Sequence, residues 1–163
     1  MPGTQAVDLI LWRHAEAEDD LADEMQAPLD LNRSLTHRGE KQALRMAAWL
    51  DRQLPEGARI WVSPARRCEQ TALALGRKYK VRPELAPGTK AEQLLELVQW
   101  PAYKSPVLVI GHQPVLGQTI ARLLGMKETE CAVKKGALWW LRNRERDGQS
   151  RTVIVTVQSP ELL

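Results

Sequence analysis

The sequence predicts an α/β fold with a mostly parallel central sheet and helices on both faces, a three-layer α/β/α sandwich. Short apolar segments alternate along the chain with longer segments whose apolar residues recur every three or four positions. The nearly continuous apolar runs over 7–12 and 106–110 are typical of strands buried on both faces of a parallel sheet. Strands that alternate with helices build such a layered sheet.

The first predicted elements are a strand, a polar loop and a helix. The strand covers 7–12, and the loop covers 15–35. A helix follows from about 37 to 53, because apolar residues recur on one face and Thr36 can act as its N-cap. This order places a long acidic loop between the first strand and the first helix.

The next segment repeats the strand-to-helix order. A strand over 59–62 runs into Ser63-Pro64, a typical N-cap followed by proline at the first helical position. The expected helix extends from 64 to about 79, and a weak strand follows over 80–85.

Two more helices and one more strand are expected before residue 126. Thr89 and Glu92 have the spacing of a capping box that opens a helix. The strand over 106–110 leads to a second helix, which Gly125 ends.

The chain closes with two β segments, over 136–142 and 152–158. The connection between them has Asp147-Gly148 at its centre, which predicts a hairpin. No repeat or linker interrupts the pattern, so we expect one domain over 1–163.

Bulk properties favour a soluble protein of the cytoplasm. Of the 163 residues, 44% are hydrophobic and 26% charged, and no apolar run is long enough for a membrane span. The N-terminus lacks the pattern of a signal peptide. The only two cysteines, Cys68 and Cys131, are expected to be buried thiols and not a disulfide.

The net charge of +3 conceals an uneven distribution. Seven of the 20 acidic residues lie within 15–32, a segment without Lys or Arg. The rest of the chain therefore contains 13 acidic and all 23 basic residues. This excess of positive charge favours phosphorylated or acidic partners. The basic residues are scattered and form no nucleic-acid motif, so we expect no nucleic-acid partner.

Imidazole and guanidinium groups follow three of the predicted strands. His14 comes after the first strand, Arg67 shortly after the second, and His112 after the strand over 106–110. Ligands bind beyond the carboxyl ends of strands in such sheets, so these side chains should meet at one edge. Guanidinium groups match phosphate oxygens, and a neutral imidazole can attack phosphorus. No closely spaced ligand set is present, so we expect neither a metal nor a cofactor.

Three motifs resemble the histidine phosphatase superfamily, and within it the small SixA-like phosphohistidine phosphatases. They are Leu-Trp-Arg-His-Ala over 11–15, Val-Ser-Pro-Ala-Arg-Arg-Cys-Glu-Gln-Thr-Ala over 62–72, and Val-Ile-Gly-His-Gln-Pro over 109–114. The segment Arg-Ser-Leu-Thr over 33–36 resembles a further SixA-like motif, Arg-Pro-Leu-Thr. The resemblance covers nearly the whole chain and implies a phosphoglycerate mutase-like fold.

The resemblance implies a role for each matched residue. His14 would be the nucleophile that becomes phosphorylated, and Arg13 and Arg67 would clamp the phosphoryl oxygens. His112, in its protonated form, would stabilise the charge of the transition state, and Arg33 would be a further phosphate contact. The family's spacing selects Arg67 over its neighbour Arg66, which is expected to face solvent.

The chain departs from the family pattern at two kinds of position. Ala15 replaces the glycine that usually follows the Arg-His pair. Family members that hydrolyse alkyl phosphates use a carboxylic acid to protonate the leaving group, and at its two usual positions this chain has Pro87 and Gln113. An imidazole leaving group needs no such acid, so the sequence favours a phosphohistidine substrate. Glu84 or an acid of the 16–24 loop remains a possible substitute.

Three functions remain open at this stage. The first is removal of phosphate from phosphohistidine on a protein, such as a phosphotransfer domain, in signal transduction. The second is hydrolysis of small phosphate esters by the same superfamily chemistry. The third is a phosphoprotein-binding module without turnover. The sequence leaves open the oligomeric state and whether loop 15–33 closes over the site.

Overall fold

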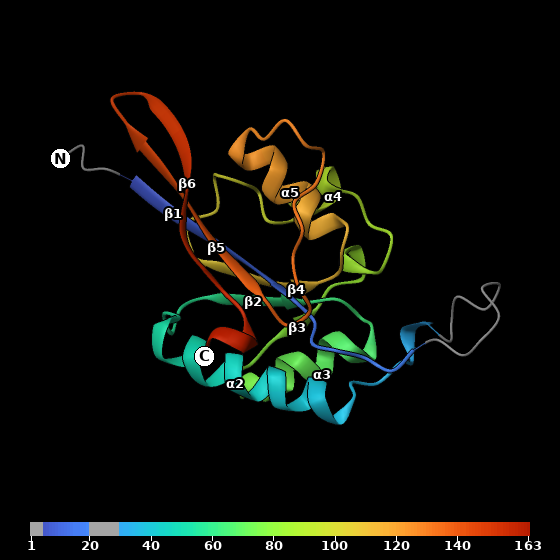
Figure 1. The fold of residues 1–163 in the computed structure, drawn as a ribbon. Coiled ribbons are helices and arrows are strands. Elements are labelled where there is room, and N and C mark those ends of the chain that lie inside the picture. The colour runs from blue at the N-terminus through green and yellow to red at the C-terminus, as the bar shows by residue number, and fades with distance from the viewer. Residues whose placement is uncertain (1–4, 20–29) are drawn as a thin grey trace.

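The computed structural model describes residues 5–19 and 30–163, and in them a six-stranded sheet forms the centre of the molecule (Figure 1). The strand order is β3-β2-β4-β1-β5-β6. The first four strands are parallel to one another, β5 is antiparallel to β1, and β6 is antiparallel to β5. This confirms the mostly parallel sheet with a closing hairpin. The strands are β1 (Gln5–Arg13), β2 (Arg59–Val62), β3 (Lys80–Val81), β4 (Val107–Gly111), β5 (Leu138–Arg146) and β6 (Gln149–Gln158).

Helices cover both faces of the sheet, which confirms the three-layer arrangement. Helices α2 and α3 lie against one face, and α4 and α5 lie against the other (Figure 1). The helices are α2 (His37–Gln53), α3 (Arg66–Leu75), α4 (Ala91–Leu97) and α5 (Val115–Leu124), with 3₁₀ turns at Pro83–Leu85 and Pro160–Leu162.

Strand β1 divides the core in two, and the alternation of its side chains explains why the segment 9–12 is wholly apolar. Ile10 and Trp12 pack into the cluster beneath α2 and α3, whereas Leu9 and Leu11 pack into the cluster beneath α4 and α5. Successive side chains of a strand point to opposite faces, so a strand covered on both sides has no solvent-facing position. The Arg13-His14 pair follows this buried segment, and there Arg13 is partly exposed whereas His14 is still buried.

The helix predicted from 64 to about 79 is shorter in the structure, by about two residues at its start and about four at its end. Ala65 is the N-cap, without a side-chain cap, and the helix begins at Arg66 and ends at Leu75, where Gly76 adopts a left-handed φ of 74°. Ser63 is therefore not the N-cap: its hydroxyl accepts from the Ala65 N–H just before the helix and lies 2.7 Å from His112 Nε2. The predicted strand over 80–85 is reduced to Lys80–Val81 followed by a 3₁₀ turn.

The predicted N-cap of α2 is confirmed, whereas the predicted capping box of α4 is not. The Thr36 hydroxyl oxygen accepts a hydrogen bond from the Gly39 N–H, which confirms the predicted cap of α2. The capping box predicted from Thr89 and Glu92 is wrong. Gln93 supplies the reciprocal hydrogen bond of the capping box instead of Glu92, since its side-chain oxygen accepts from the backbone N–H of Lys90 at 3.0 Å.

The closing hairpin is confirmed and is longer than predicted. Asp147 and Gly148 both take positive φ angles, 53° and 76°, which suit a tight two-residue turn between β5 and β6. Cys68 is buried as expected, but Cys131 is only partly buried, because it lies in an irregular segment after α5.

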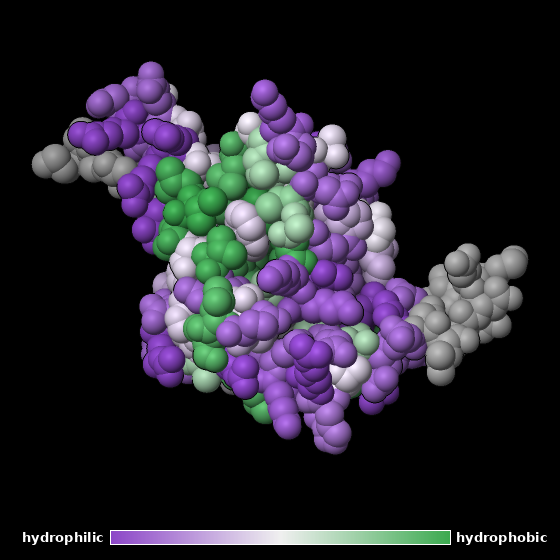
Figure 2. Space-filling model, viewed as in Figure 1, coloured by the Kyte–Doolittle hydropathy of each residue, from purple (hydrophilic) through white to green (hydrophobic). Residues whose placement is uncertain are grey.

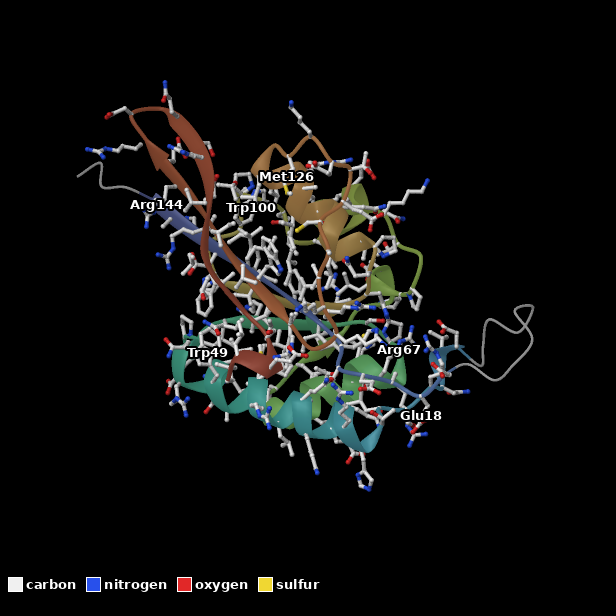
Figure 3. All side chains as sticks on the ribbon, viewed as in Figure 1. Glu18, Trp49, Arg67, Trp100, Met126 and Arg144 are labelled. Carbon is white, nitrogen blue, oxygen red and sulfur yellow. The ribbon has the colours of Figure 1, made fainter. Side chains whose placement is uncertain are left out.

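Apolar and hydrophilic residues gather on different parts of the surface. Figure 2 shows apolar residues gathered along β6, where Ile154, Val155 and Val157 are exposed. Figure 3 places Arg67 and Glu18 far from Arg144 of the hairpin, on a side where hydrophilic residues dominate Figure 2. None of the helices within 5–19 and 30–163 has the length and apolarity that crossing a membrane requires.

Candidate active site

The carboxyl ends of β1, β2 and β4 bring the predicted residues together. Arg13 of β1 pairs with Gly111 of β4, so the residues that follow, His14 and His112, lie side by side with ring centroids 5.3 Å apart. Arg67 reaches the same place from the first turn of α3, with its NH2 group 3.3 Å from His112 Nδ1. The sequence prediction that these distant positions share one edge of the sheet is confirmed.

His14 is held through Nδ1, and its other ring nitrogen has no hydrogen-bond partner within 5–19 and 30–163. Its Nδ1 lies 2.8 Å from the carbonyl oxygen of Ala15, and because a carbonyl only accepts, Nδ1 carries the proton. Burial, together with the nearby Arg67 and Arg13, lowers the pKa of His14 to about 4. The ring is therefore neutral at pH 7 and keeps a lone pair on Nε2, as a nucleophile requires.

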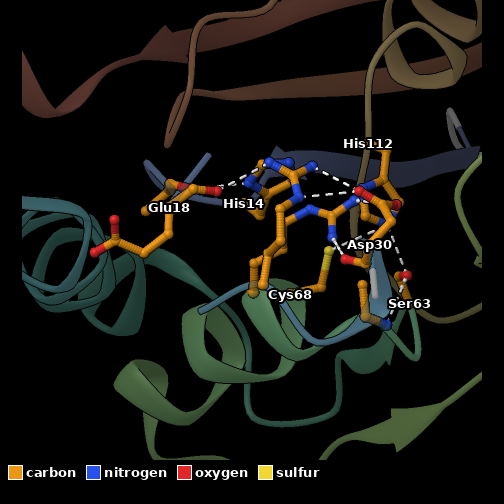
Figure 4. Close-up of polar contacts among 10 residues, drawn as sticks. His14, Glu18, Asp30, Ser63, Cys68 and His112 are labelled. Atoms are coloured by element: carbon orange, nitrogen blue, oxygen red, sulfur yellow. Dashed lines mark hydrogen bonds and ion pairs between the residues drawn. The ribbon is translucent and has the colours of Figure 1, made fainter. Parts of the chain in front are cut away.

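His112 is also buried and neutral. Its Nε2 lies 2.7 Å from the Ser63 hydroxyl, and its Nδ1 faces the Arg67 guanidinium (Figure 4). Burial and the charge of Arg67 lower the pKa of His112 to about 3. Without a bound anion the ring is therefore neutral, and the protonated His112 expected during phosphoryl transfer stays a prediction. A phosphoryl dianion beside the ring would act in the opposite direction and raise its pKa.

Two arginines hold buried N–H donors that lack a partner among the described residues. These are the Nε atoms of Arg13 and Arg67. Each guanidinium is otherwise anchored, since Arg13 NH1 donates to the Val133 carbonyl at 2.8 Å and Arg67 NH1 donates to the Asp30 carbonyl at 2.6 Å. Buried donors are almost always paired in folded proteins, so orphaned ones beside two imidazoles indicate an anion site.

Asp30 is the site residue that sequence reasoning missed. One carboxylate oxygen accepts from Arg33, at 2.8 Å from NH2, and the other accepts from Arg67 NH2 at 3.2 Å (Figure 4). Burial raises the pKa of the Asp30 carboxyl, but the two arginines outweigh that effect and hold it below its ordinary value. The Asp-x-x-Arg spacing of 30–33 signals the local pair, whereas nothing in the sequence signals the contact with Arg67.

A cavity of about 290 Å³ opens at this end of the sheet and collects these groups. Its lining carries more positive than negative charge, because Asp19 and Asp30 are its acidic residues. Such a balance attracts an oxyanion. The basic and imidazole residues that line it are Arg13, His14, Arg33, Arg67, His112 and Lys135.

Two further cationic or imidazole residues lie outside the cavity. Arg66 is exposed beside the buried Arg67, as predicted, and the side chain of His37 is 97% exposed. Within the ranges 5–19 and 30–163, no group of three or more His, Cys, Asp or Glu side chains is arranged to hold a metal ion.

The two usual positions of a proton donor hold no acid in the cavity. Pro87 and Gln113 both line it. The Gln113 amide is fully used in the fold, because its oxygen accepts from the Gly117 N–H at 2.6 Å and its nitrogen donates to the Cys131 carbonyl at 3.0 Å.

The substitute acids considered from sequence differ in their position. Glu84 does not line the cavity and pairs with Arg82 at 3.3 Å. Among the acids of the 16–24 loop, Asp19 lines the cavity, whereas Asp20, Asp23 and Glu24 lie outside the described residues. Asp19 is therefore the described acid of that loop best placed to meet a bound group.

Comparison with known proteins gives a consistent result. Residues 9–90 match the model of the histidine phosphatase superfamily (branch 1). The phosphohistidine phosphatase SixA of Escherichia coli is 34% identical over 125 residues, which cover 71% of this chain and 73% of that protein. A SixA homologue of Haemophilus influenzae is 30% identical over 137 residues, covering 74% and 79%. The structure of the protein histidine phosphatase SixA complexed with tungstate superimposes with a TM-score of 0.76 at 28% identity, over 95% of this chain and 98% of that one.

Proposed function

Because this chain belongs to branch 1 of the histidine phosphatase superfamily, we propose that it removes the phosphoryl group from phosphohistidine on a protein. The observation that carries the proposal is the pairing of a fixed, neutral His14 with orphaned arginine N–H donors, beside positions 87 and 113 that offer no acid. The relatives that are named as phosphohistidine phosphatases support the same substrate class.

The proposed reaction has two steps. In the first, His14 Nε2 attacks the phosphorus, the bond to the substrate imidazole breaks, and His14 carries the phosphoryl group. Arg13, Arg67 and Arg33 bind the phosphoryl oxygens, on which charge is spread in the transition state. In the second, water attacks the phosphorus and the bond to His14 breaks, which releases inorganic phosphate.

The leaving group distinguishes this substrate from a phosphate ester. An alkoxide is strongly basic, and losing a general acid costs on the order of 10² to 10⁴ in rate. Imidazole departs without that cost, because a phosphohistidine ring that carries a proton on its other nitrogen leaves as a neutral, weakly basic molecule. A cavity of about 290 Å³ accepts a phosphoryl group together with an imidazole ring.

A single observation favours the second candidate, hydrolysis of a small phosphate ester. Asp19 lines the cavity and could serve as the proton donor. The two candidates predict different effects of Asp19→Asn. Ester hydrolysis would lose at least tenfold in kcat with Asp19 as the acid, whereas phosphohistidine hydrolysis would change by less than about twofold.

The deciding experiment compares kcat/KM for a phosphohistidine-bearing phosphotransfer domain with kcat/KM for a panel of sugar phosphates and phosphoserine. We expect the phosphohistidine protein to be preferred by at least about a hundredfold. A higher kcat/KM for any ester in the panel would overturn the proposal. A purely binding function would leave all substrates unhydrolysed.

A further inference from the structure

The Ser63 hydroxyl is committed to an imidazole and not to a helix cap. Ser63 follows β2 and is fully buried, and its Oγ accepts from the Ala65 N–H at 3.2 Å. The same oxygen lies 2.7 Å from His112 Nε2, the shortest contact that the ring makes. Helix α3 begins without a side-chain cap. The serine that sequence analysis assigned to a cap therefore points at the second histidine of the site.

The opposite edge of the His112 ring determines where its proton lies. Nδ1 is 3.3 Å from Arg67 NH2, and a guanidinium only donates hydrogen bonds. Nδ1 must then accept, so the proton of the neutral ring is on Nε2 and is donated to Ser63 Oγ. In this arrangement His112 presents a lone pair toward the anion cavity.

A bound phosphoryl group demands the opposite arrangement. An anionic oxygen facing His112 Nδ1 needs a donor there, and the same oxygen can accept the N–H that Arg67 now gives to the ring. Nδ1 must gain a proton, either by transfer of the Nε2 proton through solvent or by uptake of one more proton. In the first case Nε2 becomes an acceptor, and in the second it remains a donor.

We propose that Ser63 is a positioning residue whose hydroxyl holds His112 with Nε2 toward β2 and Nδ1 toward the phosphoryl group, and reverses its hydrogen bond when the proton on Nε2 changes. A hydroxyl can both donate and accept, so it satisfies Nε2 in either state without movement of the ring. The inference rests on the proposed function, because it deepens the role of His112 in that site.

No other group near Nε2 among the described residues can both accept a strong hydrogen bond from Nε2 and donate one to it. The Cys68 sulfur lies 3.5 Å from Nε2, and burial raises the pKa of that thiol to about 12. A protonated thiol is a weak hydrogen-bond partner in both directions. The charged groups that affect the ring are Arg67, Arg13 and Asp30, and they lie toward the cavity with His14.

The first test is spectroscopic and needs no substrate. Nitrogen NMR of ¹⁵N-histidine-labelled protein reports which imidazole nitrogen carries a proton, with His112 assigned through His14→Gln and His37→Gln. We expect Nε2–H in the free protein and a proton on Nδ1 after saturation with tungstate. In Ser63→Ala the free ring should keep its proton on Nε2, because Arg67 still faces Nδ1, but the Nε2 signal should shift because that N–H has lost its acceptor. Thr119→Val is the matched control, since it removes a buried hydroxyl that bonds Val115 in α5.

The second test is kinetic. Ser63→Ala should lower kcat about ten- to hundredfold, the loss expected from one hydrogen bond to a charged group, with KM changed less than threefold. Ser63→Thr keeps a hydroxyl and should restore kcat to within about fivefold of the wild type. Circular dichroism melting of each variant confirms that the folded protein is compared.

The outcomes separate the two proposals. Wild-type signals for His112 in folded Ser63→Ala, or an Nδ1 that stays unprotonated with tungstate, would overturn the role of Ser63. A wild-type protein that shows the expected tautomers but hydrolyses no phosphohistidine would overturn the proposed function and leave the positioning role intact. A purely structural serine would lower the melting temperature without changing the His112 spectrum.

Discussion

The ends of β1 and β4 lie side by side and each carries a buried histidine, yet groups of different kinds hold the two rings. His14 Nδ1 faces the carbonyl oxygen of Ala15, which can only accept. His112 Nε2 faces the Ser63 hydroxyl, which can accept or donate. The end of β1 therefore fixes one tautomer and keeps a lone pair available, while the end of β4 allows a change of protonation.

The largest expected effect comes from removing the fixed ring. His14→Ala should lower kcat by about 10⁴-fold or more, because it removes the proposed nucleophile, and the lone pair of the neighbouring His112 Nδ1 faces the Arg67 guanidinium. The matched control is His37→Ala, since the His37 side chain is 97% exposed and remote from the site. Steady-state kinetics on a phosphohistidine protein would measure both. Activity of His14→Ala within tenfold of the wild type would contradict the assignment of the nucleophile.

The second effect tests Arg67, whose guanidinium lies at hydrogen-bond distance from His112 Nδ1. Arg67→Ala should lower kcat by about 10² to 10³, the loss typical of a donor that stabilises transition-state charge. Arg66→Ala, one residue away and exposed, should change kcat by less than twofold. Similar losses in the two variants would show that general basicity of α3 matters and not the contact with His112.

The third prediction concerns the pH dependence of kcat/KM, which differs between the buried His14 and an imidazole with an ordinary pKa. Protonation of Nε2 removes the lone pair, so activity is lost as pH falls through the pKa of His14. With that pKa lowered to about 4, kcat/KM at pH 5.5 should remain above nine-tenths of its value at pH 7.5. An unperturbed pKa near 6.5 would instead cause a loss of about tenfold.

Acid hydrolysis of phosphohistidine needs a blank without enzyme at each pH. The loss of activity should follow the NMR titration of His14, whose charged neighbours are Arg67, Arg13 and Arg33. A His14 titration midpoint near 6.5 would show that burial and these arginines do not act on the ring as described.

The smallest effect concerns Asp30, which shares its arginines with any bound oxyanion. Asp30→Asn removes a negative charge beside the cavity, so we expect the Kd for tungstate to fall about three- to tenfold. Asp51→Asn is the control, because Asp51 pairs with Arg77 away from the site. Isothermal titration calorimetry would measure both. A higher Kd for Asp30→Asn would show that the carboxylate mainly orients the arginines.

The sequence predicted the parts of the site that strand order determines. Apolar runs identified β1 and β4, and parallel strands present their carboxyl ends at one edge, so the meeting of His14, Arg67 and His112 followed. The fold class and the closing hairpin followed from the same alternation of segments. These predictions depend on period and order, which a single sequence carries.

The missed features depend on choices between partners in space. A serine before proline can cap a helix or bond another group, and only the fold shows that Ser63 lies beside His112. Asp30 contacts Arg67 across 37 positions of sequence, which no local pattern encodes. The protonation of His112 likewise depends on burial and on the Arg67 charge, and both appear only in the folded chain.

The central claim is that His14 takes the phosphoryl group onto its free nitrogen, and rapid mixing with a ³²P-phosphohistidine protein tests it most directly. The account predicts a labelled enzyme in which mass spectrometry locates the phosphoryl group on His14, stable in alkali and lost in acid. It also predicts no label on His14→Ala. Release of inorganic phosphate without a labelled wild-type enzyme at any time point, or label on another residue, would contradict the account.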